Sequence, residues 1–263
     1  MISLGAGVQS STMALMAAAG EITPMPTACV FADTGDEPDA VYEWLKYLEP
    51  LLPFELIRVQ KGRLSDYLTT PYKSKKNNKW TVAGFPAFVL NQDGSQGIMS
   101  RQCTSDFKVY PIDRVLTRLM RTHKTKTCFK WLGISLDEIY RIKPARRNSV
   151  KHRWPLVEAR MNRNDCLRWL EAHGHPKPPR SACIYCPYRG NDEWRALTPS
   201  EFTRAVEFEK KMQAAHAGGS LIAIPYLHRS MVPLDEVDFS TDIERGQGLL
   251  NGFQNECSGH CGL

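Results

Sequence analysis

The sequence predicts an α/β fold, a doubly wound and mainly parallel sheet, with a smaller cysteine-containing region toward the C-terminus. Three observations predict this class. Strand and helix patterns alternate over the first 60 residues, two strand patterns each lead directly into a glycine-containing loop, and one helix's worth of residues separates the two loops. Such alternation is typical of parallel sheets, in which each helix connects one strand to the next. At 263 residues and 42% apolar content, the chain can bury a full core.

The first elements follow from local patterns. Only Met1 and Ile2 precede the first glycine loop, so we expect either a clipped first strand or a native start upstream of Met1. Gly20 ends a helix of small residues, and Pro38 opens the next helix at a position where proline is tolerated. The patterns predict, in order, helix 11–19, strand 28–32, helix 38–52 and strand 54–59.

The later elements are less regular. The polar, glycine-dotted residues 73–97 predict a mobile surface loop. Residues 111–123 have apolar side chains at helical spacing with arginines between them, and predict an amphipathic helix before a strand over 129–134. Asn162 and Thr198 are good N-caps and predict two further helix starts. After Pro144 the alternation stops, so we divide the chain into an α/β core, residues 1–144, and a helical and cysteine-containing region, residues 145–263.

Two loops carry the residue types of a nucleotide triphosphate site. In the first, Gly5 and Gly7 let the backbone approach an anion, Ser10 and Ser11 add hydroxyl donors, and the following helix offers unpaired N–H groups. The second, Asp33-Thr34-Gly35, follows a predicted parallel strand, at the edge where open α/β sheets bind ligands. The lysine of the common P-loop is missing. A plain strand-to-helix turn is the alternative interpretation of the first loop.

The charge pattern points to a polyanionic partner. The formal net charge is +6, and the basic residues cluster, which suits nucleic acid; a solvated basic face that serves only solubility is the alternative. No apolar run is long enough to span a membrane and no leader precedes the first loop, so we expect a cytoplasmic protein without a membrane partner. The clusters are Lys73, Lys75, Lys76 and Lys79; Arg114, Arg118, Arg121, Lys124 and Lys126; and Arg141, Lys143, Arg146, Arg147, Lys151 and Arg153.

Eight cysteines in a chain expected to be cytoplasmic indicate metal or redox chemistry rather than disulfides. Cys183 and Cys186 form a C-x-x-C, a spacing that suits one metal ion but also a redox dithiol. Cys103 and the C-terminal Cys257 and Cys261 are the other candidates. The remaining cysteines, expected to be buried apolar residues, are Cys29, Cys128 and Cys166; His228 is expected to be a hydrogen-bonded histidine rather than a ligand.

Five segments in this order resemble the PP-loop ATP pyrophosphatases, in particular the phosphoadenylylsulfate (PAPS) reductase-like family. They are the two loops above, Cys103 with Lys108 and Pro111, residues 133–138, and the C-x-x-C. The resemblance implies an adenine nucleotide alpha hydrolase-like fold that binds ATP with Mg2+, the first loop cradling the β- and γ-phosphates and the second lying by the adenosine. Ser135 stands where that family has an arginine, which leaves recognition of a sulfated nucleotide in doubt. The implied nucleotide contacts are Ser3, Gly5, Gly7, Gln9, Ser10, Ser11, Asp33, Thr34, Gly35, Gly133, Ser135, Asp137 and Glu138, and the catalytic candidates are Ser10, Ser11, Asp33 and Cys257.

The same resemblance implies a 4Fe-4S cluster. Its iron–sulfur members use a Cys-Cys-x-x-x-Lys-x-x-Pro segment and a later C-x-x-C; here Thr104 replaces the second cysteine, so Cys257 or Cys261 would supply the missing ligand. Cys257 also lies in a segment similar to the C-terminal Glu-Cys-Gly of reductases, whose cysteine attacks sulfur, so two roles compete for it. Zinc (Zn2+) is the alternative metal for Cys103, Cys183, Cys186 and one C-terminal cysteine.

The resemblance and the basic clusters together favour an ATP pyrophosphatase that adenylates an acceptor for sulfur insertion into nucleic acid. Such a protein would resemble the sulfur-transfer component of DNA phosphorothioation or a tRNA thiolase, with a cysteine desulfurase as possible sulfur donor and a possible homo-oligomeric state. Two alternatives stay open. One is a PAPS or adenylylsulfate reductase that uses Cys257 as nucleophile, and the other is a non-catalytic nucleotide- or DNA-binding subunit.

Overall fold

The computed structural model describes residues 1–73, 78, 80–81, 84–91, 93–217, 223–240 and 244. The described chain forms two compact units. We call Met1–Lys61 with Ser105–Ser181 the sheet unit, and Gly62–Thr104 with the described residues from Ala182 onward the cysteine unit. This division differs from the expected boundary at residue 144, because helix α6 packs against helix α1 and keeps residues 145–181 with the sheet.

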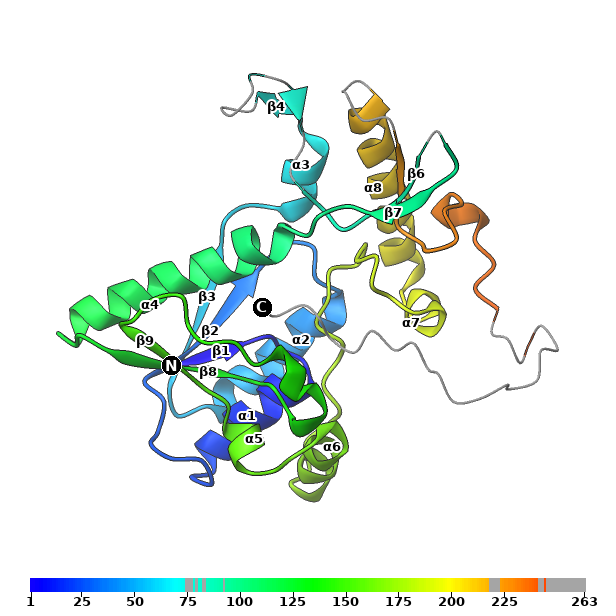
Figure 1. Ribbon diagram of the computed structural model, residues 1–263. Coiled ribbons are helices and arrows are strands. Elements are labelled where there is room, and N and C mark those ends of the chain that lie inside the picture. The colour runs from blue at the N-terminus through cyan, green and yellow to red at the C-terminus, as the bar shows by residue number, and fades with distance from the viewer. Residues whose placement is uncertain are drawn as a thin grey trace. The chain divides into compact units, whose positions relative to one another are not determined.

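The sheet unit is built on five parallel strands in the order β3-β2-β1-β8-β9 (Figure 1). This arrangement confirms the predicted α/β class with a parallel sheet and is consistent with double winding. From the central β1 the chain first builds outward through β2 and β3, and then returns to β8 on the other side of β1. The winding therefore reverses between β1 and β8, which is where open parallel sheets bind ligands. The strands are β1 Ile2–Leu4, β2 Ala28–Asp33, β3 Glu55–Gln60, β8 Cys128–Leu132 and β9 Val150–Arg153.

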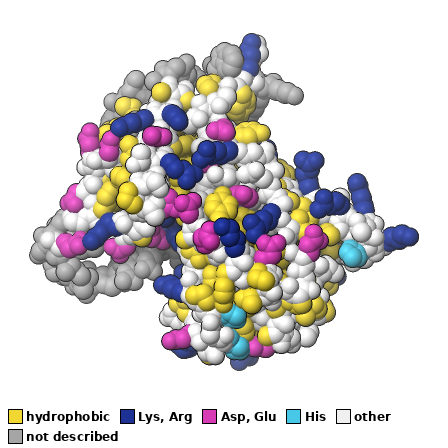
Figure 2. All heavy atoms as spheres, turned by 180° about the vertical axis from the view of Figure 1, so that it is seen from behind, with side chains coloured by type: hydrophobic (Ala, Val, Ile, Leu, Met, Phe, Trp, Pro, Cys, Tyr) yellow, Lys and Arg dark blue, Asp and Glu magenta, His cyan; other side chains and the backbone are white. Residues whose placement is uncertain are grey.

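Helices cover both faces of this sheet, because side chains alternate along its strands. In β2, Cys29 and Phe31 join the core on one face with α1, α2 and α6, whereas Val30 and Ala32 join the core beneath α4 on the other. The outer side of α4 carries exposed Arg side chains, and Lys and Arg side chains gather at the right of Figure 2. The helices are α1 Val8–Ala18, α2 Asp39–Leu48, α4 Tyr110–Thr122, α5 Pro155–Glu158 and α6 Arg163–Ala172, with short 3-10 helices at Glu49–Leu51 and Leu136–Arg141 and a π-helical turn at Ser105–Val109.

The predicted N-caps are confirmed where the structure tests them. Asn162 and Asp165 form a reciprocal capping box at the start of α6, and Thr198 and Glu201 bond reciprocally at the start of α8. Helix α1 begins at Val8, three residues earlier than predicted, so its first turn belongs to the glycine loop.

The cysteine unit contains a small antiparallel sheet in the order β10-β6-β7, packed with helix α8. The expected surface loop over 73–97 was wrong for its strand segments, because β6 finds its hydrogen-bond partner in β10, far along the chain. The core of the cysteine unit includes an aromatic cluster of Phe85, Tyr185 and Phe208. Its elements are α3 Leu64–Thr69, β4 Tyr72–Lys73, β5 Trp80–Thr81, β6 Phe88–Leu90, β7 Gln96–Ile98, α7 Asn191–Arg195, α8 Pro199–Ala217, β10 Ile224–Tyr226 and a 3-10 turn Leu234–Glu236.

Within the described ranges, no helix combines the length and the apolar character needed to cross a membrane.

Candidate nucleotide site and cysteine loop

The loop between β1 and α1 is shaped by Ser10. The N–H of Gly5 donates to Ser10 Oγ (3.1 Å), and Ser10 Oγ donates to the carbonyl of Gly7 (3.3 Å). Neither glycine takes a positive φ; the left-handed position falls instead on the buried Ala6, at φ 60°. A Cβ at Gly5 would lie 3.5 Å from Ser10 Oγ and one at Gly7 3.8 Å from Ser181 Cβ, which are ordinary contacts. The fold of the loop itself therefore requires glycine at neither position, and the expected role of these glycines in letting an anion approach the backbone stays a prediction.

The first turn of α1 presents backbone donors at this loop. Gly7 is the N-cap, and no described side chain caps the helix. Since a helix leaves its first N–H groups without intrahelical partners, those of Val8, Gln9 and Ser10 are available to an anion, and the helix dipole favours negative charge there.

Gly133, at the end of β8, lies directly against this turn. A Cβ built on Gly133 would be 2.7 Å from the Cα and 2.8 Å from the backbone nitrogen of Ser10, closer than real Cβ contacts allow. Only glycine fits at this position without a backbone shift. The structure thus brings together two predicted segments that are more than 120 residues apart in the sequence, at the point where the sheet reverses its winding.

Arg163 connects the first turn of α1 to the segment after β8. Its Nη1 donates to Gln9 Oε1 (2.9 Å), and its backbone N–H donates to Asp137 Oδ1 (3.1 Å). The guanidinium brings a positive charge to the glycine loop, a role that the loop sequence itself does not provide. The sequence did not reveal this role of Arg163, because the only local signal, its place after the N-cap Asn162, indicates a helix start and not a partner 154 residues away.

Two polar side chains that follow Gly133 in the sequence, those of Ser135 and Glu138, are buried. Ser135 is fully buried, and its hydroxyl has no hydrogen-bond partner among the described residues. Glu138 pairs with Arg141 (2.7 Å), and burial raises the pKa of the Glu138 carboxyl above its ordinary value despite this cation.

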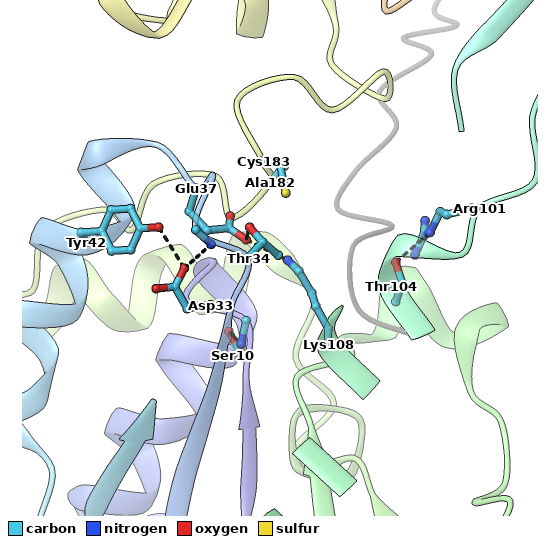
Figure 3. Close-up of polar contacts among 12 residues, drawn as sticks. Ser10, Asp33, Thr34, Glu37, Tyr42, Arg101, Thr104, Lys108, Ala182 and Cys183 are labelled. Atoms are coloured by element: carbon cyan, nitrogen blue, oxygen red, sulfur yellow. Dashed lines mark hydrogen bonds and ion pairs between the residues drawn. The ribbon is translucent and has the colours of Figure 1, made fainter. Parts of the chain in front are cut away.

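The Asp33-Thr34-Gly35 turn at the end of β2 is fixed by its own side chains (Figure 3). Asp33 Oδ1 accepts from the N–H of Gly35 (2.7 Å) and from the hydroxyl of Tyr42 (2.9 Å). Burial, and then the hydrogen bond to Asp33, raise the pKa of the Tyr42 phenol, so it remains a neutral donor. Gly35 takes φ 74°, a left-handed conformation that explains the glycine of this turn.

A buried ion pair lies beside this turn. Glu37 Oε1 accepts from Thr34 Oγ1 (3.2 Å) and pairs with Lys108 Nζ (3.1 Å), and the Glu37 side chain is buried completely. Lys108 is the lysine of the segment that resembles the family's cysteine-lysine-proline segment, and it lies at the carboxyl end of β2, in the sheet unit.

Two predicted contacts occupy structural positions. Ser11 is fully buried, and its hydroxyl accepts from the indole N–H of Trp44 (2.8 Å). This bond ties α1 to α2, and the Ser11 backbone N–H bonds to the carbonyl of Gly7 (3.0 Å). Ser3 lies inside β1, paired with Val30 and Leu132 in the sheet register.

In the cysteine unit, Cys183 and Cys186 lie in one turn, closed by the Cys186 N–H bonding to the Cys183 carbonyl (3.0 Å). Both side chains are almost fully buried. Two thiols in one turn form a donor pair that suits an iron–sulfur cluster as well as zinc, so this loop fits half of either site. Tyr185, between the two cysteines, stacks on Phe208 with ring centroids 3.9 Å apart and anchors the turn in the core.

The buried side chain of Arg189 stabilises this turn. Its guanidinium donates to three backbone carbonyls of the turn: Nη2 to Ala182 (3.0 Å) and Cys183 (3.1 Å), and Nε to Ile184 (3.1 Å). This role of Arg189 is not among the expectations from the sequence. A charged residue three positions after a C-x-x-C carries no local signal of burial, and only the structure shows that its donors are used on the backbone.

The other predicted ligands do not complete a set in the described structure. Cys103 is half-buried in the cysteine unit, and Thr104, at the place of the family's second cysteine, accepts from Arg101 Nε (2.9 Å). Among the residues that the structure describes, no group of three or more His, Cys, Asp or Glu side chains is arranged to hold a metal ion. Cys257 and Cys261 lie outside the described residues.

The expected burial is confirmed for Cys29 and Cys166, which are fully buried, and burial raises the pKa of the Cys166 thiol to about 12. It is wrong for Cys128, which is half-buried and whose thiol donates to the carbonyl of Ser149 (3.8 Å). His228 is hydrogen-bonded through both ring nitrogens, to Ser230 Oγ (2.7 Å) and Asn191 Oδ1 (3.1 Å), as expected of a satisfied histidine.

No protein-family model matches the chain, and no curated protein matches it.

Proposed function

We propose that the chain is an ATP pyrophosphatase with an adenine nucleotide alpha hydrolase-like fold, and that it adenylates an acceptor for sulfur insertion into nucleic acid. The observation that carries this proposal is the close approach of Gly133 to Ser10 at the junction of β1 and β8. It brings a strand-end segment against an uncapped helix N-terminus, at the edge where parallel sheets bind nucleotides.

In this proposal, different groups of residues have different roles. The N–H groups of the first turn of α1 would bind the β- and γ-phosphates of ATP, and Arg163, held by Gln9 and Asp137, would add positive charge. The Asp33-Thr34-Gly35 turn would lie at the adenosine. Mg2+ bound with ATP would neutralise charge on the phosphates.

The proposed reaction has two displacement steps, and in each step the bond that forms replaces a bond that breaks. An oxygen of the acceptor attacks the α-phosphorus of ATP, a new oxygen–phosphorus bond forms, and the bond from the α-phosphorus to the bridging oxygen breaks as pyrophosphate leaves. A sulfur nucleophile, supplied by a donor such as a cysteine desulfurase, then displaces AMP from the acceptor. The protein's contribution is preorganised positive potential at the departing pyrophosphate.

The cysteine loop extends this proposal to a metal centre. Cys183 and Cys186 would supply two thiolates for a 4Fe-4S cluster or, alternatively, for zinc, with Cys103 and Cys257 or Cys261 as further ligands. Two buried thiols in a turn held by Arg189 support this assignment.

The test is the identity of the nucleotide product. The full-length protein is incubated with Mg2+, ATP labelled at the α-phosphate, duplex DNA and sulfide, and the products are separated by chromatography. The proposal predicts labelled AMP together with pyrophosphate. Labelled ADP, or no turnover by protein that binds ATP, would contradict it.

Ser10→Ala provides a variant, and Thr12→Ala its matched control. Ser10 Oγ makes both hydrogen bonds that shape the glycine loop, whereas Thr12 Oγ1 bonds the Val8 carbonyl inside α1 (2.9 Å) and the Cys166 thiol, away from that loop. We expect Ser10→Ala to reduce AMP formation at least tenfold and Thr12→Ala to leave it within about twofold. Equal effects would mean that the loop geometry is not used.

A further inference from the structure

One face of helix α4 forms a stripe of exposed cationic side chains. Arg114, Arg118 and Arg121 follow Tyr110 at spacings of four, four and three residues, so the four side chains lie along one side of the helix. All four are exposed, Tyr110 to 57%. The opposite side of α4, with Ile112, Val115 and Leu116, is buried against the sheet. We call Tyr110, Arg114, Arg118 and Arg121 the basic stripe.

The charge of the basic stripe is not neutralised by its surroundings. No described acidic side chain forms an ion pair with its three arginines. Asp113, on the same helix, is paired with the buried Lys130 (2.9 Å). By contrast, Lys46, Arg58 and Arg168, elsewhere in the sheet unit, each pair with a neighbouring carboxylate.

Residues from another part of the sequence extend the stripe. Arg147 Nη1 donates to Thr117 Oγ1 (2.9 Å), which holds the Arg147 side chain against α4. Lys124 and Lys126 follow the helix and are exposed. The structure therefore joins members of two basic sequence clusters into one surface, visible where Lys and Arg side chains gather at the right of Figure 2.

The stripe starts at the edge of the sheet that carries the candidate nucleotide site. Lys108, two residues before α4, pairs with Glu37 just after β2, so the N-terminal end of α4 lies at the carboxyl edge of the strands. From Tyr110 to Arg121 a helix rises about 16 Å, which matches about five phosphates along one strand of a duplex.

We infer that the basic stripe binds the phosphate backbone of double-stranded DNA and leads it toward the nucleotide site. This inference rests on the proposed function and names its acceptor class. A straight row of guanidinium groups suits the fixed phosphate spacing of a duplex. Single-stranded RNA is bound largely by stacking of its unpaired bases on aromatic side chains. The basic stripe contains one aromatic side chain, Tyr110 at its end, so it suits the backbone of a duplex better than unpaired bases.

The test is binding of a fluorescein-labelled 20-base-pair DNA, followed by anisotropy at several salt concentrations without ATP or sulfide. The variant is R114Q/R118Q/R121Q, since glutamine preserves helix propensity. The matched control is K46Q/R58Q/R168Q, which removes the same charge from paired positions. We expect the stripe variant to lose at least tenfold in affinity and its salt slope to fall by about 2.7, as for three lost phosphate contacts.

The control triple should bind within about twofold of the wild type. Equal losses in the two variants would mean that net charge alone drives binding, and no loss in the stripe variant would overturn the inference. Stronger competition by unlabelled tRNA or single-stranded DNA than by the duplex would also overturn it. Since the DNA-binding test contains neither ATP nor sulfide, and ATP binding is measured by titration without nucleic acid, a failed DNA-binding test leaves the nucleotide site standing, and the converse also holds.

Discussion

The junction of β1 and β8 in the sheet unit and the Cys183–Cys186 turn of the cysteine unit are held in shape by different kinds of contact. At the first site, strand order sets the backbone of Gly133 against that of Ser10, helix α1 presents N–H groups, and the short Ser10 side chain adds two hydrogen bonds within the loop. The second is fixed by buried side chains, in which Arg189 binds three carbonyls and Tyr185 stacks on Phe208. A backbone site depends on space and register, whereas a side-chain site depends on single long side chains. The comparison predicts that point substitutions act more strongly in the cysteine unit.

The largest effect is expected for Arg189→Met. The substitution removes the guanidinium donors from the carbonyls of Ala182, Cys183 and Ile184, although the Cys183 carbonyl keeps its bond from the Cys186 N–H, so we expect a loss of about 3–5 kcal/mol in the local unfolding free energy. Hydrogen exchange of peptides covering residues 182–190, together with the reaction rate of Cys183 and Cys186 with a thiol reagent, measures it. Arg189→Lys should restore part of the protection. Unchanged hydrogen exchange in Arg189→Met would contradict the proposed difference between the two units.

A pH effect of about 3 kcal/mol is expected from His228. Burial lowers the pKa of His228 to about 4 in the folded chain, against about 6.5 when unfolded. Between these values the unfolded state binds a proton that the folded state does not, so the unfolding free energy falls as the pH drops from 6.5 to 4. Urea unfolding of the wild type and His228→Gln at pH 7, 5 and 4 isolates this contribution. Parallel pH profiles in the two proteins would contradict the assignment.

A smaller effect, about 1–2 kcal/mol, is expected for Trp44→Phe in the sheet unit. The substitution keeps the aromatic packing but removes the donor to the buried Ser11 hydroxyl. Trp169→Phe is the matched control, because its indole bonds to the exposed Glu21 and should cost less than about 0.5 kcal/mol. Urea unfolding measures both variants. A loss for Trp44→Phe as large as that for Arg189→Met would remove the contrast between the units.

The same contrast explains what the sequence could predict. The alternating elements, the two glycine loops and the caps at Asn162 and Thr198 have local signals, and the structure places them close to their expected positions. Gly133 and Ser10 meet because parallel strands end at one edge, a rule that needs no knowledge of side chains.

The features that the sequence did not predict depend on contacts with residues far away along the chain. Strand β6 pairs with β10, more than 130 residues later, so its polar surroundings indicated a loop. The sequence pattern of Ser11 is that of a phosphate donor, and it did not indicate that the hydroxyl is fully buried and accepts from the Trp44 indole N–H. Arg163 and Arg189 have no local signal, because what defines each of them is the set of atoms that its guanidinium reaches.

The most direct test of the central claim is calorimetric titration of ATP with Mg2+ into the wild type and Gly133→Ala. A methyl group at Gly133 must displace the Ser10 backbone, and with it the N–H groups proposed to bind phosphate. Gly190→Ala is the control, since its added Cβ would meet only ordinary contact with Glu193. We expect at least tenfold weaker ATP binding by folded Gly133→Ala and unchanged binding by Gly190→Ala. Equal affinity of the wild type and folded Gly133→Ala would contradict a nucleotide site at the junction of β1 and β8.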